Sequence, residues 1–108
     1  MRGIAEGFLQ EEEMIVGVIR VEVYIPDAGS LKAKRKELRS IKDRLRSTFN
    51  VSVSEIDNQD LWQRGSIGIA LVGSDTSHIR ESLDRIVSFL ERNWSHLILN
   101  IRQEIVSL

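Results

Sequence analysis

Apolar residues recur at every second position in residues 15–25, and then at every third or fourth position from residue 31. The first spacing is typical of a β-strand with one buried face, and the second is typical of an amphipathic helix. Pro26-Asp27-Ala28-Gly29 separates the two segments, because proline cannot donate to a strand ladder and glycine favours turns. Ser30 is a suitable N-cap residue, so we expect a helix from Leu31 to the region of Asn50.

The rest of the chain repeats this change of spacing. Residues 51–56 and 61–72 read as strands, and the turn residues Asp57-Asn58-Gln59-Asp60 lie between them. Gly73-Ser74-Asp75 ends the second of these strands and begins another helix. The apolar face of that helix consists of Ile79, Leu83, Ile86, Val87 and Leu90, and a last strand is marked by Leu97, Leu99, Ile101 and Ile105.

The order β-α-β-β-α-β predicts an α+β fold, a ferredoxin-like sandwich with a four-stranded antiparallel sheet and two helices on one face. Right-handed crossovers place the strands at 15–25 and 61–72 in the middle of the sheet, and these are the most apolar strands. We expect residues 14–108 to form one domain and residues 1–13 to be a flexible N-terminal extension. Two explanations stay open for residues 1–13: a short extension, or a start codon assigned upstream of Met14.

Several function classes are excluded by what the chain lacks. The chain has no cysteine, which excludes a disulfide framework, a thiolate nucleophile and a thiolate zinc site. No apolar run approaches about 18 residues, and residues 1–13 lack the pattern of a signal peptide, so we expect a cytoplasmic protein without a membrane span. The two histidines, His78 and His96, are far apart, and no Gly-x-Ser-x-Gly motif occurs. We therefore expect no catalytic residue, no metal and no cofactor.

The net charge of −1 conceals one strongly basic segment, residues 31–49, which holds eight basic and two acidic side chains. On a helical wheel most of these cations occupy an arc of about 120°, which only Asp43 interrupts. Several lie in the first turn, where the helix dipole disfavours cations. The expected second helix carries balanced charges instead. We predict a nucleic-acid-binding face consisting of Lys32, Lys34, Arg35, Lys36, Arg39, Lys42 and Arg46. The alternative is a solvated basic face, or one paired with acidic neighbours or a partner subunit.

The acidic segment from Glu55 to Arg64 is the second notable feature. Its carboxylates, Glu55, Asp57 and Asp60, are of the kind that binds Mg²⁺ or Ca²⁺, but the EF-hand spacing is absent. Turn residues account for this composition, so we favour an acidic hairpin turn that is anchored by packing of Trp62, with Arg64 paired to a carboxylate. The segment is a candidate secondary surface, with Asp57, Gln59, Asp60, Trp62 and Arg64 as its residues.

From Met14 onward the chain resembles the bacterial YlxP-like family, a small domain of unassigned function. The resemblance rests on residues 14–26, on Ser30-Leu31-Lys32-Ala33-Lys34-Arg35, on residues 42–46 and 49–53, and on Asp57-Asn58-Gln59-Asp60-Leu61-Trp62-Gln63-Arg64. It implies a ferredoxin-like fold, and it implies a link to translation because genes of this family often neighbour those for ribosome maturation and initiation factors. Two departures are Asn58, where the family commonly has His, and residues 1–13, which precede the usual start of the family.

These observations favour a non-enzymatic accessory factor that binds RNA or a ribosomal particle through the basic face of the first helix. The alternative is a homodimeric protein-interaction module, of unknown process, that uses the open sheet face or an edge strand. A third hypothesis, an enzyme or metal protein, depends on Glu55, Asp57 and Asp60 alone.

Overall fold

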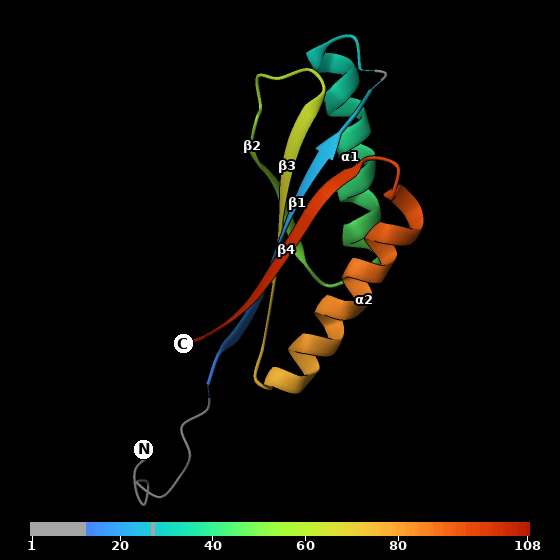
Figure 1. Ribbon diagram of the computed structural model, residues 1–108. Coiled ribbons are helices and arrows are strands. Elements are labelled where there is room, and N and C mark those ends of the chain that lie inside the picture. Colours follow the sequence, from blue (N-terminus) through green and yellow to red (C-terminus); the bar gives the residue numbers. More distant parts are fainter. Residues whose placement is uncertain (1–12, 27) are drawn as a thin grey trace, which may run out of the picture.

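The computed structural model describes residues 13–26 and 28–108, so the extension expected at residues 1–13 lies almost wholly outside the described residues. The described chain forms β1 (Ile15–Tyr24), α1 (Leu31–Thr48), β2 (Ser52–Asp57), β3 (Arg64–Gly73), α2 (Thr76–Trp94) and β4 (Ile98–Ser107). The four strands form one sheet in the order β2-β3-β1-β4, and all neighbours are antiparallel. Both helices lie on the same side of this sheet (Figure 1). The predicted ferredoxin-like βαββαβ fold is confirmed.

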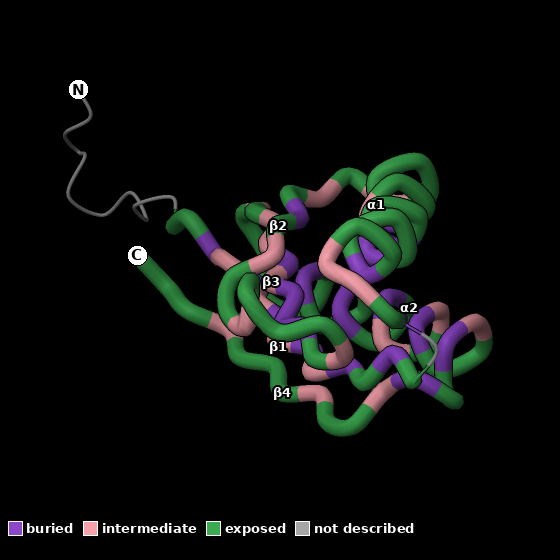
Figure 2. The backbone as a smooth tube through the Cα atoms, turned by 90° about the horizontal axis from the view of Figure 1, so that it is seen from above, coloured by how far each residue is buried: buried purple, intermediate pink, exposed green. Residues whose placement is uncertain are grey.

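The core lies between the sheet and the two helices, and each helix is buried along the side that faces the sheet (Figure 2). β1 contributes every second residue to this core, as its alternating pattern predicts. Gly17 belongs to the same face, and a Cβ atom placed there would lie 2.7 Å from Ile79 Cγ2. The absence of a side chain at Gly17 therefore lets α2 approach the middle of β1.

The ends of α1 agree with the sequence to within two residues. The Ser30 hydroxyl accepts a hydrogen bond of 3.1 Å from the backbone N–H of Ala33, so Ser30 is the N-cap. The helix ends at Thr48, two residues before Asn50. Neither helix in the described part of the chain is long and apolar enough to cross a membrane.

Two strand assignments differ from the pattern in the sequence. β3 begins at Arg64 rather than at residue 61, because Leu61 donates to the Asn58 carbonyl in a turn and the Gln63 carbonyl accepts from Ile25. In β4, the register against β1 shifts between Glu22 and Val23, and Leu99 is exposed although it was grouped with the apolar residues of that strand. A bulge of this kind moves a side chain off the face that strict alternation predicts.

Candidate nucleic-acid interface and the loop beside it

The basic face of α1 consists, in the structure, of Lys32, Arg35, Lys36, Arg39 and Lys42, which we call the cationic row. Four of these side chains are exposed, and Lys42 is half-buried. None of the five forms an ion pair with a residue that the structure describes. The first turn of α1 contains no acidic residue that would offset them. The cations of the row are therefore accessible, and neither an ion pair nor the helix dipole at the start of α1 stabilises them.

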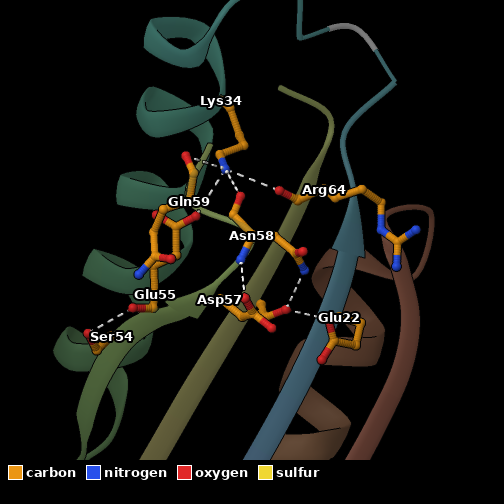
Figure 3. Close-up of polar contacts among 9 residues, drawn as sticks. Glu22, Lys34, Ser54, Glu55, Asp57, Asn58, Gln59 and Arg64 are labelled. Atoms are coloured by element: carbon orange, nitrogen blue, oxygen red, sulfur yellow. Dashed lines mark hydrogen bonds and ion pairs between the residues drawn. The ribbon is translucent and has the colours of Figure 1, made fainter. Parts of the chain in front are cut away.

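Lys34 does not belong to this surface, and the prediction that it binds nucleic acid is wrong. Its side chain is completely buried, and its Nζ lies 3.0 Å from Glu55 Oε2. It donates hydrogen bonds of 2.7, 3.4 and 3.1 Å to the carbonyl oxygens of Asn58, Gln59 and Arg64 (Figure 3). Its position on the wheel, within the apolar arc of α1, is the signal from which burial could have been predicted. Lys34 instead holds the loop after β2 against the start of α1.

Arg46 occupies an intermediate position. Its Nη2 donates a 2.7 Å hydrogen bond to the carbonyl oxygen of Val53 in β2, and its Nη1 lies 3.5 Å from Asp43 Oδ1. The end of α1 is thereby tied to an edge strand of the sheet. These contacts commit Arg46 to the fold, so we leave it out of the cationic row. Because Arg46 lies within the same arc of the helical wheel as the row, its contact with Val53 places the row on the side of α1 that faces the β2 edge.

Asn58 connects the two faces of the sheet. It is the one non-glycine residue with positive φ in the described chain, at 61°, which is left-handed backbone that asparagine tolerates. Its carbonyl accepts from Lys34, and its side-chain Nδ2 donates 2.8 Å to Ser66 Oγ on the open face (Figure 3). Its own N–H donates 2.8 Å to Asp57 Oδ1. The conformation of this loop is thus fixed from both sides.

A charged network covers part of the open sheet face. Arg20 Nε donates 2.7 Å to Glu22 Oε2, Arg20 Nη2 lies 3.5 Å from Asp57 Oδ2, and Ser66 Oγ donates to Glu22 Oε1. The hydrogen bond to Glu22 raises the pKa of Arg20 above its usual value. Burial by itself opposes ionisation of Glu22, but the hydrogen bonds from Ser66 and Arg20 outweigh it and lower the pKa of this carboxyl group. Glu22 is therefore a carboxylate near neutral pH.

The three carboxylates of the acidic segment do not converge. Glu55 faces Lys34, whereas Asp57 lies beside Arg20 and accepts from the Asn58 backbone. Asp60 is exposed in the loop. Among the described residues, no group of three or more His, Asp or Glu side chains is placed to hold a metal ion. Glu55 and Asp57 thus have structural partners on opposite sides of the sheet.

The expected anchoring of the loop by Trp62 is wrong. Trp62 is 56% exposed, and its neighbour Leu61 is also exposed. Arg64 forms no ion pair with a described residue, so the expected pairing to a carboxylate is wrong as well. The loop is anchored by Lys34 and by the Gln63 side chain, which donates 2.7 Å to the carbonyl of Pro26. Trp62 is therefore a surface side chain on a loop of fixed backbone.

The open sheet face also carries a shallow groove of about 780 Å³. Its walls combine apolar and charged side chains from all four strands, among them Val18, Arg20, Ile56, Arg102 and Glu104. Tyr24 is the aromatic residue of this face in the described chain, at the end of β1. One aromatic residue is too few for the base-stacking sheet that RNA-recognition modules of this topology use.

A family model described as "Protein of unknown function (DUF503)" matches residues 16–103. The chain belongs to the DUF503 family. The uncharacterized protein YlxP of Bacillus subtilis (strain 168) is 46% identical to it over 77 residues, which cover 71% of this chain and 84% of that protein. The predicted resemblance to YlxP is thereby confirmed. The DUF503 match includes the cationic row, the buried Lys34 and the loop that Lys34 holds.

Proposed function

We propose that this DUF503 protein is a non-enzymatic accessory factor that binds the phosphate backbone of RNA on the cationic row of α1. The observation that carries the proposal is a set of cations on one side of a helix without ion-pair partners among the described residues. From Lys32 to Lys42 the row extends for about 15 Å along the helix axis. A row of this kind binds polyanions because each neutralised phosphate releases its condensed counterions.

The second helix supports this reading by contrast. α1 and α2 have 18 and 19 residues and cover the same sheet, so the fold makes similar demands on their outer faces. α2 balances Arg80, Arg85 and Arg92 with Glu81, Asp84 and Glu91, whereas α1 carries an excess of cations. The excess on α1 is therefore not required for a solvated helix. A local electrostatic cost without local compensation is often a mark of function.

Trp62 adds a second kind of contact to the same region. It is exposed on the loop that Lys34 holds against the start of α1, and this loop and the start of α1 lie at the same end of the molecule (Figure 1). An exposed aromatic side chain beside a basic groove or row is a stacking platform for unpaired bases. Single-stranded RNA would engage both features, with phosphates on the row and a base on Trp62.

The open sheet face supports a function less well. Its charged network of Arg20, Glu22 and Asp57 is internally satisfied, and covering it with a partner would require removing these charges from water. A homodimer that uses the open face is therefore the weaker candidate. The genomic association of the YlxP-like family with ribosome maturation factors favours RNA as the ligand of α1.

The experiment compares two triple variants of equal net charge. Lys32→Glu, Arg35→Glu and Arg39→Glu reverse the row, and Arg80→Glu, Arg85→Glu and Arg92→Glu reverse exposed cations of α2 as the matched control. Binding of a labelled single-stranded RNA of about 20 nucleotides is followed by fluorescence anisotropy at about 50 mM salt. We expect the α1 variant to lose at least about a hundredfold in affinity, and the α2 variant to lose much less.

Trp62→Ala provides an independent arm. We expect it to weaken RNA binding by about tenfold, because one stacked base contributes about 1–3 kcal/mol, while thermal stability stays the same. Equal losses of RNA affinity in the two triple variants would show that only the net charge of the protein matters, and would overturn the proposal. If the unaltered protein does not bind RNA, the proposal fails. Capture of an acidic protein by α1 would then identify the ligand of the row as a protein.

A further inference from the structure

The two edge strands of the sheet differ in how they are protected. β2 is six residues long, has a register shift next to Asp57, and has one carbonyl occupied by Arg46. Short length, bulges and nearby charge are the devices by which proteins prevent edge strands from pairing with other chains. β4 is ten residues long and has its one register shift at its beginning, near Ile98. Its regular part, residues 100–107, carries no proline and no bulge, and its two charges, Arg102 and Glu104, are of opposite sign and so do not by themselves repel a second copy.

β4 also leaves side chains unsatisfied on both faces of the sheet. Arg102 and Glu104 are exposed on the open face, and neither forms an ion pair with a described residue. Arg102 lies opposite Arg20 of β1, and like charges in that arrangement repel. On the helix side, Ile101 and Ile105 are only partly buried at the margin of the core. A neighbouring strand with a negative charge beside Arg102, a positive charge beside Glu104 and apolar residues beside Ile101 and Ile105 would satisfy all four.

We propose that this neighbour is β4 of a second copy of the chain, in an antiparallel pair centred on Gln103. In this register Arg102 lies opposite the partner's Glu104, Ile101 lies opposite the partner's Ile105, and Gln103 lies opposite the partner's Gln103. The two-fold symmetry repeats each of the first two pairs. The pair includes residues 99–107 of both copies, which is nearly the whole of β4. The result is one continuous sheet of two copies.

The sequence of β4 disfavours the neighbouring registers. A two-fold axis perpendicular to the sheet keeps each residue on its own face, so the pair must be centred on a residue and not between two residues. The neighbouring registers are therefore those centred on Arg102 and on Glu104. A pair centred on Arg102 places Arg102 opposite the partner's Arg102, and a pair centred on Glu104 places two glutamates opposite each other. Like charges directly opposite are destabilising. Only the pair centred on Gln103 converts the same two residues into two opposite-charge contacts.

The dimer is compatible with the proposed function and does not depend on it. α1 contacts β2, at the other edge of the sheet, so pairing through β4 leaves the cationic row uncovered in both copies. It also leaves the open-face network of Arg20 and Glu22 in contact with water. An edge-to-edge contact of this kind is small, so we expect association in the micromolar range rather than an obligate dimer.

Charge reversal and restoration test the pair directly. Sedimentation equilibrium of the full chain at about 100 µM is expected to give a mass above the monomer mass of 12.3 kDa. Arg102→Glu and Glu104→Arg, made singly, are each expected to weaken the dimer by about tenfold or more, and the double variant is expected to restore it, since the charges are exchanged across the two-fold. Circular dichroism verifies that each variant is folded. A monomer at all concentrations, or a double variant weaker than both single variants, overturns the proposal.

Cysteine cross-linking tests the register. The natural chain has no cysteine, so Gln103→Cys introduces a single thiol that faces its own symmetry mate. Oxidation is expected to give a disulfide-linked dimer, because opposite residues in antiparallel strands have Cβ atoms about 5 Å apart. Asn100→Cys is the matched control on the same strand: its symmetry mate is six residues away, or about 20 Å, and we expect no cross-link. Cross-linking of Asn100→Cys but not of Gln103→Cys overturns the register.

Discussion

The Nζ of Lys34 and the carbonyl oxygen of Asn58 lie 2.7 Å apart, which joins the start of α1 to the loop that carries Trp62. The same ammonium group lies 3.0 Å from Glu55 Oε2, so one buried side chain binds both β2 and the loop that follows it. Because Glu55 Oε2 accepts no hydrogen bond from a described residue, its stabilisation comes from the charge of Lys34.

Lys34→Met is therefore expected to lower the free energy of unfolding by about 3 kcal/mol, because it leaves the Glu55 carboxylate buried without a counter-charge. Urea denaturation of the two proteins measures this difference. Lys34→Met combined with Glu55→Leu is expected to cost less than the sum of the two single changes, since no charge is then left alone. Equal midpoints for the wild type and Lys34→Met would contradict this account of the loop.

Substitutions of Asn58 separate its backbone role from its side-chain role. Asn58→Ala is expected to cost about 2 kcal/mol, because it loses the hydrogen bond to Ser66 and strains left-handed backbone. Asn58→Gly removes only the hydrogen bond and should be about 1 kcal/mol more stable than Asn58→Ala. Thermal unfolding of both variants ranks them, and the opposite order would show that positive φ at this position is not a constraint.

Acid is expected to weaken the fold through Glu22. Its pKa is lower in the folded protein than its ordinary value of 4.5, so its contribution is complete above that value and is lost as the pH falls through the folded-state pKa. The free energy of unfolding should therefore decline below about pH 4.5, and Glu22→Gln should decline less steeply. Urea unfolding between pH 6 and pH 3 measures both slopes, and parallel curves would assign the acid sensitivity to other groups.

Two glycines provide a matched pair for the packing of β1 against α2. A Cβ at Gly17 would lie 2.7 Å from Ile79 Cγ2 and 3.0 Å from Leu83 Cδ2, whereas a Cβ at Gly29 would meet nothing within 4 Å. We expect Gly17→Ala to cost about 1–3 kcal/mol through overpacking, and Gly29→Ala to change stability by less than about 0.5 kcal/mol. Calorimetric unfolding compares them. Equal stability of the two variants would mean that α2 shifts freely to admit the methyl group.

Most of the fold could be predicted from the sequence because period and turn chemistry agree in each element. β1 alternates cleanly and α1 has both an apolar arc and an N-cap, so these elements were located to within two residues. The apolar pair Leu61 and Trp62 extends the predicted strand to residues 61–63, which lie outside β3 in the structure. Hydrophobicity alone does not distinguish a strand end from an exposed loop residue, and the hydrogen bonds that form this turn are not visible in the sequence.

The candidate site shows the same limit. The bias of charge along α1 was visible in the sequence, but the fate of each cation depends on what the sheet presents to it. The charge of Lys34 predicts a binding residue, although its place on the wheel coincides with the apolar arc. A buried lysine needs polar partners, and those of Lys34 come from β2 and the following loop, which the sequence of α1 does not reveal. Arg46 lies within the basic arc of the wheel, but its acceptor, the Val53 carbonyl, belongs to a different element and is not visible in the sequence of α1.

The salt dependence of RNA binding tests the central claim most directly. Single-stranded RNA whose phosphates bind the five cations of the row should show a slope of about −3.5 in log affinity against log salt, because each neutralised phosphate contributes about −0.7. Arg39→Ala should reduce the magnitude of this slope by about 0.7, and Arg85→Ala should leave it unchanged. A slope near zero, or equal slopes for wild type and Arg39→Ala, would contradict the assignment of α1 as the RNA-binding surface.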